Sequence, residues 1–540
     1  MLICPQCNSL FTIFPEDDSF YKRINVPAPT LCPDCRTQRR WAHRGKNLYI
    51  RKCDKCQKRT MSWFHPDLKT ATTYCGDCFY SDENDPANLA RNFDFNRPFF
   101  EQFKELAKEA PRHISNTMHD ENSEYIICAH NNKNCYFTDE LDYCWDCYFG
   151  YNIQHCKDCV ETIFIRDSEV CYNIQKGENC HFVFHSKNVF NCANSAYLAN
   201  CRNCKSCLFC TNLRNKENYI LNKKVSPQEF QQTWNAIFDG SRKTQQQNHK
   251  KFEDFLKTQP TPHAILVNCE DCTGDYLSNC KNVKDSFWID NSRDVRYSSD
   301  IHYSRDCYDT NIYEGELFYE SLHAGPKSYG LYFTTLCWFS NNIYYSIDLR
   351  TCNDCFGCAG IKHKQYHILN KKYTKEEYNK LKEKIIDHMK KTGEWGEFFP
   401  IEDSPHPYNL TMAQRFSPLT KEQAKQKGYS WLDEKEEIKE EAEKLIPENI
   451  KDIPKDIIEK VFTCSKTNKK FRFIPAEIRF YRQHHLPLPT TAPITRIENL
   501  WKKMPPRKLE TQSCTKCKAK IQTPLKNALC TKCYSESITL

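Results

Sequence analysis

The sequence predicts a mainly β, multidomain protein. Terminal modules built on paired cysteines flank a duplicated, cysteine-rich parallel β-solenoid with capping helices. Three observations predict this class: Cys-x-x-Cys pairs near both ends, a duplication that relates the two ends, and a second duplication in the middle of the chain. At 540 residues the chain can form several domains, because single hydrophobic cores stop growing at about 250 to 300 residues.

Twelve of the 34 cysteines form three sets of two Cys-x-x-Cys pairs. Two intervening residues let both thiolates of a pair reach one metal at about 2.3 Å, and a second pair completes a tetrahedral shell with no open position. We therefore expect about three structural zinc ions, with iron as the less favoured alternative because it also binds four cysteines. The predicted ligands are Cys4, Cys7, Cys32 and Cys35; Cys53, Cys56, Cys75 and Cys78; and Cys514, Cys517, Cys530 and Cys533.

The two ends of the chain are copies of one unit. Residues 4–41 and 464–501 align without a gap at an offset of 460, with twelve identical residues. In the second copy three of the four ligand positions hold Thr467, Ala492 and Thr495, so Cys464 alone remains. We expect this copy to bind no metal there and to be held by apolar residues. A four-cysteine unit follows each copy.

The N-terminal unit resembles a small zinc-ribbon (treble-clef-like) family. The family pattern is Cys-x-x-Cys, an aromatic residue, an acidic stretch, Phe-Tyr, a proline and Cys-x-x-Cys-Arg. In this chain it corresponds to Cys4, Cys7, Phe11, residues 16–18, Phe20, Tyr21, Pro29, Cys32, Cys35 and Arg36. The resemblance covers about the first 40 residues, returns in degenerate form at 464–501, and implies a zinc-binding module without a reaction. The whole chain also resembles cysteine-rich solenoid proteins of small-genome bacteria, which implies no activity.

The middle of the chain repeats at an offset of 148. Residues 220–224 and 368–372 share the sequence Ile-Leu-Asn-Lys-Lys, and each copy is followed by a capping box that predicts a helix start, at Ser226 and at Thr374. In the first half several cysteines, such as Cys135 and Cys156, are twenty-one positions apart among short Tyr, Phe, Val and Ile runs. This period predicts a parallel β-solenoid whose coils are near that length.

The cysteines of the predicted solenoid allow two main interpretations. A cysteine that recurs once per coil behaves as a small buried hydrophobic residue and stacks in an interior column. Their local clustering favours additional metal sites as the alternative, and disulfides are the third choice. The candidate extra ligands are Cys144, Cys147, Cys156, Cys159, Cys201, Cys204, Cys207, Cys210, Cys352, Cys355 and Cys358.

These patterns predict seven consecutive segments. We expect an amphipathic helix within the second segment, at 98–110, and a solvated Glu/Lys helix within the sixth, at 433–444. The segments are tandem zinc ribbons at 1–82, a helical connector at 83–120, a first solenoid half with its capping helix at 121–240, a basic polar linker at 241–263, a second solenoid half with its capping helix at 264–390, a charged helical linker at 391–460, and a degenerate ribbon followed by a Cys4 ribbon at 461–540.

Charge gives a local rather than a global indication of a partner. The formal charge is +8, but twelve zinc-bound thiolates and three divalent cations would lower it to about +2. Locally, residues 36–59 contain ten Lys or Arg and one acid, interleaved with aromatic residues, a mixture that binds phosphates and stacks on bases. The predicted nucleic-acid contacts are Arg36, Arg39, Arg40, Trp41, Arg44, Lys46, Arg51, Lys52, Arg496, Lys502, Lys503, Arg507 and Lys508.

The sequence therefore favours a non-catalytic zinc protein whose basic ends bind nucleic acid, with RNA or a ribosomal surface preferred over DNA. The first alternative is a protein-interaction scaffold that uses an aromatic-rich solenoid face, and the second is a redox or metal-storage protein that uses the solenoid cysteines. No Gly-rich loop or Ser, His and Asp set indicates catalysis, so we infer no enzyme activity and no small-molecule substrate. The absence of a signal sequence and of an apolar run of 18 residues predicts a cytoplasmic protein without membrane partners.

Overall fold

The computed structural model describes residues 1–123, 125–433 and 445–538. The Glu/Lys helix predicted at 433–444 therefore lies outside the described residues, apart from Asp433. The chain forms two compact units, each assembled from segments that are distant in sequence. Unit 1 holds Met1–Ile114, His263–Asp433 and Pro506–Ala528; unit 2 holds Ser115–Pro262 and the described residues of 434–505 and 529–540.

Unit 1 combines the N-terminal cysteine modules with the second half of the central duplication. The modules contain β1 (Leu2–Ile3), β2 (Leu10–Phe11), α1 (Pro15–Arg23), α2 (Pro33–Trp41), β3 (Tyr49–Lys52), β4 (Arg59–Ser62), β5 (Thr73–Tyr74), α3 (Gly76–Tyr80) and β6 (Arg112–His113). The helices η1 (Pro86–Leu89), α4 (Phe99–Glu109), α7 (Lys375–Thr392), η2 (Ile401–Asp403), η3 (Tyr408–Leu410), α8 (Met412–Phe416) and α9 (Lys421–Gln426), and the hairpin β33 (Glu510–Ser513) and β34 (Lys520–Thr523), complete it.

The strands of the second half form what we call the second stack. They are β18 (Leu266–Val267), β19 (Gly274–Ser278), β20 (Lys281–Lys284), β21 (Ser286–Asp290), β22 (Arg293–Arg296), β23 (Ser299–His302), β24 (Arg305–Ile312), β25 (Gly315–Ala324), β26 (Ser328–Thr335), β27 (Asn341–Tyr344), β28 (Asn353–Phe356), β29 (Gln365–Ile368) and β30 (Lys371–Lys372). Two sheets contain them, one of nine strands and one of four. All their pairings are parallel except the last, between β29 and β30.

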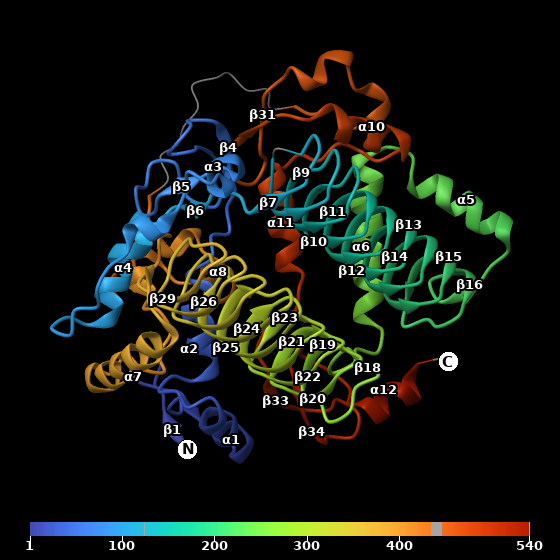
Figure 1. Ribbon diagram of the computed structural model, residues 1–540. Helices are drawn as coiled ribbons and strands as arrows, with labels where there is room; N and C mark the ends of the chain where they lie inside the picture. Colours follow the sequence, from blue (N-terminus) through green and yellow to red (C-terminus); the bar gives the residue numbers. More distant parts are fainter. Residues whose placement is uncertain (124, 434–444, 539–540) are drawn as a thin grey trace. The chain divides into compact units, whose positions relative to one another are not determined.

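Unit 2 contains the first stack, a single sheet of eleven strands paired in sequence order. They are β7 (Thr117–Met118), β8 (Tyr125–His130), β9 (Tyr136–Asp142), β10 (Tyr148–Gln154), β11 (Lys157–Arg166), β12 (Glu169–Glu178), β13 (His181–Phe190), β14 (Ala193–Arg202), β15 (Lys205–Thr211), β16 (Glu217–Ile220) and β17 (Lys223–Lys224). The remaining elements are α5 (Pro227–Ile237), α6 (Arg242–Lys257), η4 (Ile450–Asp452), η5 (Lys455–Ile458), β31 (Phe462–Thr463), β32 (Lys470–Phe471), α10 (Pro475–Gln483), α11 (Pro493–Lys502) and α12 (Thr531–Ser537). Figure 1 shows the strands of the first stack side by side in chain order.

Successive strands of the first stack are related by a register step of twelve. Cys159 pairs with Cys171, and Cys171 pairs with Val183. The coil length expected from the cysteine spacing is therefore wrong. That spacing, twenty-one, is the sum of one register step of twelve and a further nine. Cysteines separated by twenty-one residues therefore do not lie one above the other but belong to different interior columns.

A second, shorter repeat of three residues explains the backbone of the stacks. Almost every third residue has a positive φ near 50°, as at His155, Asp158, Glu161 and Phe164. In the first stack the residue that follows each of these points inward and is buried. Asn and Asp recur at the positive-φ positions because their short polar side chains tolerate this conformation best among non-glycine residues.

The interior of each stack is a set of columns with a step of twelve residues. One column of the first stack holds Cys135, Cys147, Cys159 and Cys171 in succession, and all four are at most 2% exposed. Each thiol lies within hydrogen-bonding distance of the carbonyl oxygen two residues before it, as Cys159 Sγ does to Lys157 O at 3.3 Å. Serine makes the same contact at other inward positions, as Ser168 Oγ does to Arg166 O at 2.7 Å.

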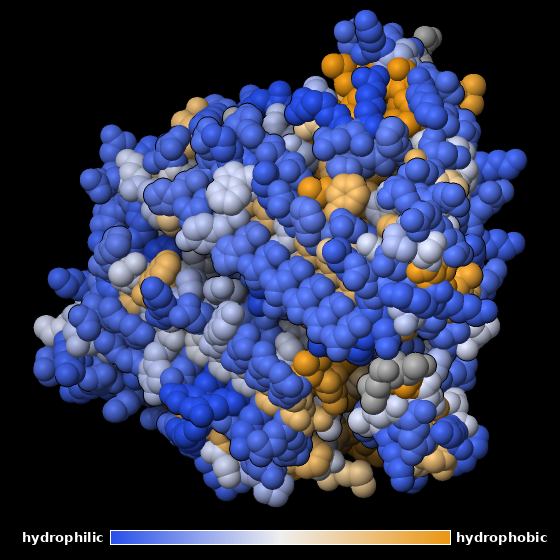
Figure 2. Space-filling model, turned by 90° about the vertical axis from the view of Figure 1, so that its right-hand side faces the viewer, coloured by the Kyte–Doolittle hydropathy of each residue, from blue (hydrophilic) through white to orange (hydrophobic). Residues whose placement is uncertain are grey.

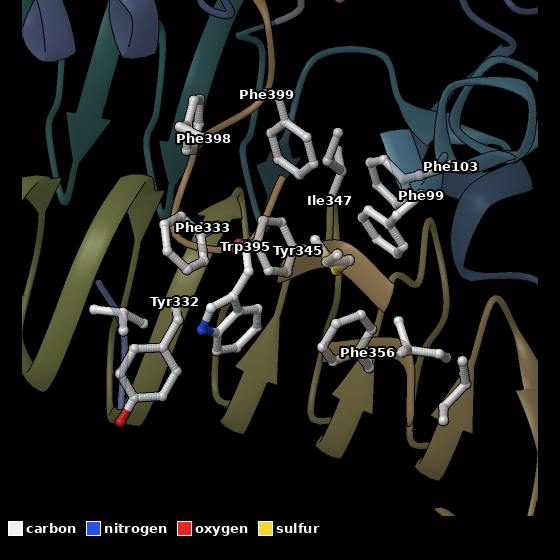
Figure 3. Close-up of a cluster of buried hydrophobic side chains, with 14 of the residues drawn as sticks. Phe99, Phe103, Tyr332, Phe333, Tyr345, Ile347, Phe356, Trp395, Phe398 and Phe399 are labelled. Carbon is white, nitrogen blue, oxygen red and sulfur yellow. The ribbon is translucent and has the colours of Figure 1, made fainter. Parts of the chain in front are cut away.

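Helices cover one side of the second stack with a largely aromatic core. Figure 3 shows Phe99 and Phe103 of α4 beside Tyr345, Phe356 and Phe399. The helix predicted at 98–110 is confirmed as α4. The capping box at Thr374 is also confirmed, with both of its hydrogen bonds, at the start of α7. At the start of α5 the Ser226 side chain makes the first of these bonds, accepting from the Glu229 N–H. The predicted polar linker at 241–263 is mostly helix α6, which packs on the first stack through Phe252.

The duplication of the chain ends is visible element by element. When the two ends are aligned, helices α1 and α10 begin and end at equivalent residues, and α2 and α11 begin at equivalent residues. The hairpins β1–β2 and β31–β32 are related in the same way. No helix in the described part of the chain has both the length and the apolar run needed to cross a bilayer.

Candidate metal centres

Three groups of four cysteines could each hold a metal ion, and they are the three sets predicted from the sequence. Within each group the four Sγ atoms all lie within 4.8 Å of one another. A tetrahedral site with zinc–sulfur bonds of about 2.3 Å requires sulfur–sulfur separations of about 3.8 Å. The Cys7 and Cys32 sulfurs are 3.6 Å apart, as are those of Cys56 and Cys75, so both groups fit such a site.

Each group is built in the same way. Its first Cys-x-x-Cys pair forms a tight turn between two short antiparallel strands, and the residue after that pair has a positive φ: Asn8, Gln57 or Lys518. The first cysteine of the second pair is the N-cap of a helix, at Cys32, Cys75 and Cys530. The partial positive charge at a helix N-terminus favours thiolates at these positions.

Backbone amides favour the ionised form of one ligand, Cys53, whereas burial raises the pKa of Cys75 in the same group to about 12. Burial raises the pKa of Cys53, but hydrogen bonds from the backbone N–H groups of Cys56, Cys75 and Lys55 outweigh it and lower the pKa to about 7. The Cys75 N–H to Cys53 Sγ distance is 3.2 Å. The donor chemistry therefore suits a soft or borderline cation that binds thiolates.

The degenerate copy keeps the turn and replaces the metal with aromatic packing. The Asn468 N–H donates to the Cys464 carbonyl at 3.0 Å, as the Asn8 N–H does to Cys4 at 2.8 Å. Beside it Phe462, Phe471 and Phe473 are at most 8% exposed, with ring centroids 5.4 to 6.2 Å apart. The equivalent residues of the first copy are Leu2, Phe11 and Ile13, so the copy that has lost three ligands has two more aromatic rings around its hairpin.

The candidate extra ligands of the two stacks lie at inward positions and are buried. They include a complete set of consecutive inward residues, Cys201, Cys204, Cys207 and Cys210, and three at Cys352, Cys355 and Cys358. Burial, the largest influence, raises the pKa of the candidates Cys144, Cys147 and Cys156 well above the usual range, which favours neutral thiols, whereas hydrogen bonds from neighbouring thiols lower the pKa of Cys204. Among the described residues, the groups of three or more ligand atoms close enough for one ion are the three terminal tetrads.

Most of the predicted nucleic-acid contacts do not face solvent. Arg36, Arg39, Arg40, Trp41, Arg44, Arg51 and Arg496 are at most 7% exposed. Lys46 and Arg507 are half-buried, whereas Lys52, Lys502, Lys503 and Lys508 are exposed. The expectation that the segment 36–59 presents its arginines as a basic surface is therefore wrong for five of its six arginines, which pair with groups inside their own unit, whereas Arg59 is exposed.

In unit 1 the arginines of α2 bind carboxylates of the second stack. Arg36 Nη2 lies 2.9 Å from Asp309 Oδ2, and Arg40 Nη1 lies 2.9 Å from Glu320 Oε2. Arg39 joins Glu320 to Glu397, at 3.0 and 2.5 Å. Three guanidinium groups thus face three carboxylates, which leaves the cluster formally neutral. We call this network the α2 clasp.

Unit 2 contains the matching contact in residues 464–501, the second copy of the terminal unit. Arg496 Nη1 lies 2.8 Å from Glu161 Oε1 and 3.1 Å from Glu477 Oε2. The Tyr481 hydroxyl donates to the same Glu161 oxygen at 2.7 Å. Burial lowers the pKa of Arg496, but Tyr481 and the two carboxylates outweigh it and raise the pKa above its usual range. Arg496 therefore stays protonated and positively charged although it is buried.

Sequence reasoning did not identify the carboxylates that pair with these arginines in either unit, although the two duplications indicated one of them in each unit. Glu161 and Asp309 are related by 148, the offset of the central duplication, just as Arg36 and Arg496 are related by the terminal offset of 460. The arginine recurs in both copies of the terminal unit, and the acid recurs in both halves of the central duplication. Their joint recurrence indicates that the arginine and the acid are in contact in each unit. We find no protein-family model that matches this chain and no match among curated proteins.

Proposed function

We propose that this protein is a non-catalytic, zinc-stabilised scaffold of two β-solenoids that docks on nucleic acid through the lysines of its third cysteine module. The module spans Cys514–Cys533. The observation that carries the proposal is that this segment contains five lysines and no Asp or Glu. All five are exposed: Lys516, Lys518, Lys520, Lys526 and Lys532.

Charge distinguishes the third module from the other two. A zinc ion with four thiolates carries a formal charge of −2. With that charge included, the segment Cys514–Cys533 has a formal charge of +3, whereas Cys4–Cys35 has −4 and Cys53–Cys78 has −1. Exposed lysines bind phosphates without reading sequence, so the expected ligand is a nucleic-acid backbone or a folded RNA.

The β-solenoid assignment is supported by the pairing and burial of the strands. Parallel partners recur at a register step of twelve residues, and buried inward residues recur every three. Each full turn would then have four inward positions. The ends of such a stack need covers, and helices α5 and α7 follow β17 and β30 directly.

The two alternative functions have less support. Many aromatic side chains of the second stack are buried against α1, α4 and the segment 395–399 of the same unit, so they are not available to a partner. On the face drawn in Figure 2 hydrophilic side chains predominate, and hydrophobic ones gather in small separate groups. Redox or storage chemistry would use the stack thiols, and burial favours the protonated form of most of them, such as Cys180 and Cys307, although neighbouring thiols lower the pKa of Cys204 and Cys269.

The test is binding of a fluorescently labelled RNA hairpin and a DNA duplex to a Lys516→Glu, Lys518→Glu, Lys520→Glu variant. We expect at least a tenfold loss of affinity at low salt, and a salt dependence whose slope falls by about one unit for each phosphate that the variant no longer neutralises. The matched control reverses three exposed lysines of α7, Lys380, Lys384 and Lys391. Equal binding by both triple variants, or no binding by the wild type, would contradict the proposal.

A further inference from the structure

One face of each stack carries exposed aromatic and cationic side chains at equivalent positions. In the first stack the outward residues Lys133, Trp145 and Lys157 are related by the step of twelve and joined by isolated parallel bridges, Lys133 and Trp145 just before β9 and β10 and Lys157 at the start of β11. In the second stack Lys281, Arg293 and Arg305 are related in the same way. The central duplication, at its offset of 148, aligns each residue of the second set with its counterpart in the first. We call these two surfaces the ladder faces.

Exposed aromatic residues gather on these faces. Tyr143 and Trp145 are 51% and 49% exposed on the first ladder face, and Tyr303 is 53% exposed on the second. Tyr143 and Tyr303 each lie two residues before a ladder residue, with one buried residue between. Tyr329, 46% exposed, continues the second ladder beyond Glu316. Aromatic rings elsewhere on the second stack are mostly covered, so the accumulation here is selective.

The second ladder face is also hollowed. A shallow, open hollow of about 730 Å³ is lined by the ladder residues Lys281, Arg293 and Arg305 and by Tyr303, together with Glu270, Cys280 and serine and asparagine residues. Its central strands provide three cations in a row. Neighbouring strands of a sheet are about 4.8 Å apart, so these cations span about 10 Å.

Acidic residues pair with four of the five ladder cations. Lys133 pairs with Glu121 at 2.8 Å, Lys281 with Glu270 at 2.9 Å and Lys157 with Glu169 at 3.4 Å, and Arg305 pairs with Glu316. All eight side chains are at least 37% exposed, and exposed pairs of this kind contribute little to stability. A phosphate can therefore displace the carboxylate at small cost. In the first ladder Glu121 and Glu169 flank the lysines and Trp145; in the second Glu270 and Glu316 flank the three cations, and Tyr329 follows Glu316.

We propose that each ladder face binds a short segment of single-stranded nucleic acid, with bases stacked on Trp145 and Tyr143 or on Tyr303 and phosphates held by the adjacent Lys and Arg. Stacking on aromatic rings tolerates any base, and the cations provide attraction to the backbone. This inference extends the proposed function, since it assigns a second kind of nucleic-acid contact away from the third cysteine module.

The test is isothermal titration of the full-length protein with single-stranded RNA and DNA 8-mers of mixed sequence. The titrations use the Lys516→Glu, Lys518→Glu, Lys520→Glu variant as the parent protein, so that the third module does not add a site, and this parent should bind two 8-mers per chain. The variants Tyr143→Ala with Trp145→Ala, and Arg293→Ala with Tyr303→Ala, should each bind one, and the fourfold variant should lose affinity by at least tenfold. Trp145→Phe, which keeps a ring, should retain most of the affinity. Tyr125→Ala, at a ring that is 38% exposed outside the ladder, is the matched control.

The outcomes separate this inference from the proposed function. Unchanged 8-mer binding by the fourfold variant would overturn the ladder faces, and loss of duplex and hairpin binding in the lysine variant would still support the third module. If the lysine variant instead keeps duplex and hairpin binding while the aromatic variants lose the 8-mers, the proposed docking module fails and the ladder faces stand. Binding of a neutral oligosaccharide such as cellohexaose, with no 8-mer bound, would assign the faces to a different ligand and overturn the inference.

Discussion

The Arg36 guanidinium is paired with the Asp309 carboxylate at 2.9 Å, and the two side chains are 1% and 0% exposed. The equivalent pair in the other unit is Arg496 and Glu161, at 2.8 Å. Each arginine also lies over an aromatic ring at equivalent positions, Tyr297 and Phe149. The two duplications of the chain are therefore linked. In both units an arginine of the terminal copy binds the equivalent carboxylate of the stack, although only the first terminal copy has a complete set of four cysteines.

Removing one partner of this pair should destabilise unit 1. Arg36→Ala leaves the carboxylate of Asp309 buried with one fewer cation, and breaking a buried pair in this way costs about 3 to 5 kcal/mol. The free energy of unfolding from urea titration measures the effect. The matched surface control is Lys22→Ala, because Lys22 pairs with Asp18 while 75% exposed and should change stability by less than about 1 kcal/mol.

A double substitution tests whether the pair itself is stabilising. Arg36→Met with Asp309→Leu removes both charges, and a well-packed apolar replacement of a buried ion pair is often neutral. We expect it to recover most of the stability lost in Arg36→Ala. An Arg36→Ala variant as stable as the wild type would mean that the α2 clasp contributes no net stability.

Loss of one ligand should affect the first ribbon but not its degenerate copy. Cys32→Ser removes a donor from a group of four and should lower the bound zinc from about three ions per chain to about two, with faster proteolysis within residues 1–41. Thr467→Ser changes an equivalent ligand position of the copy, where Phe462, Phe471 and Phe473 already pack without metal. Elemental analysis of both variants decides the matter, and equal zinc content in the two would contradict this assignment.

The sequence predicted the cysteine groups because ligand spacing is local. Two residues between cysteines and a second pair nearby are sufficient to define a tetrahedral site. The structure places the twelve cysteines in the three expected groups of four. The mainly β character and the parallel pairing were also accessible, since both follow from short β-rich runs in repeats. The step of twelve was missed although the sequence contains it, since six cysteine pairs of the first half, such as Cys135 and Cys147, are twelve apart. The four pairs that are twenty-one apart combine a full step with part of the next, and they led to the wrong coil length.

The positions of the arginines could not be read from composition. A basic run such as 36–59 has the same composition whether its side chains face phosphates or carboxylates. Which of these applies depends on Asp309 and Glu320, which lie in the opposite half of the chain. Long-range pairing of this kind becomes visible in one sequence when both partners are duplicated, as here.

Alkaline pH should weaken the stacks through their thiols. Burial raises the pKa of Cys307 in the folded chain to about 12, above the value of about 8.5 for an exposed thiol. Between these values the unfolded state loses a proton that the folded state keeps, so stability falls as pH rises, by about 1.4 kcal/mol per pH unit for each such thiol, and is fully present below about pH 8.5. Urea titrations at pH 8 and pH 10 measure this difference.

A serine variant supplies the control for the thiol prediction. In Cys307→Ser the hydroxyl can donate to the Arg305 carbonyl as Ser304 does to His302, so the fold should persist. Because serine does not titrate in this range, the loss of stability between pH 8 and pH 10 should be smaller than in the wild type. An identical loss in both proteins would show that Cys307 ionises as readily in the folded chain as in the unfolded one.

The positive-φ positions should select side chains by their backbone tolerance. Asn191 has φ of 50° and donates from Nδ2 to the Asn203 Oδ1 at 2.9 Å, in an exposed asparagine ladder. Asn191→Val places a β-branched residue in the left-handed region and should cost about 1 to 2 kcal/mol. Asn191→Gly should cost less, since glycine accepts this φ and loses only an exposed hydrogen bond. The control is Ala193→Val, because Ala193 is the first residue of β14, two positions further along the chain, and has no positive φ. Equal destabilisation by Val and Gly at position 191 would assign the role of Asn191 to its side-chain hydrogen bond rather than to its backbone conformation.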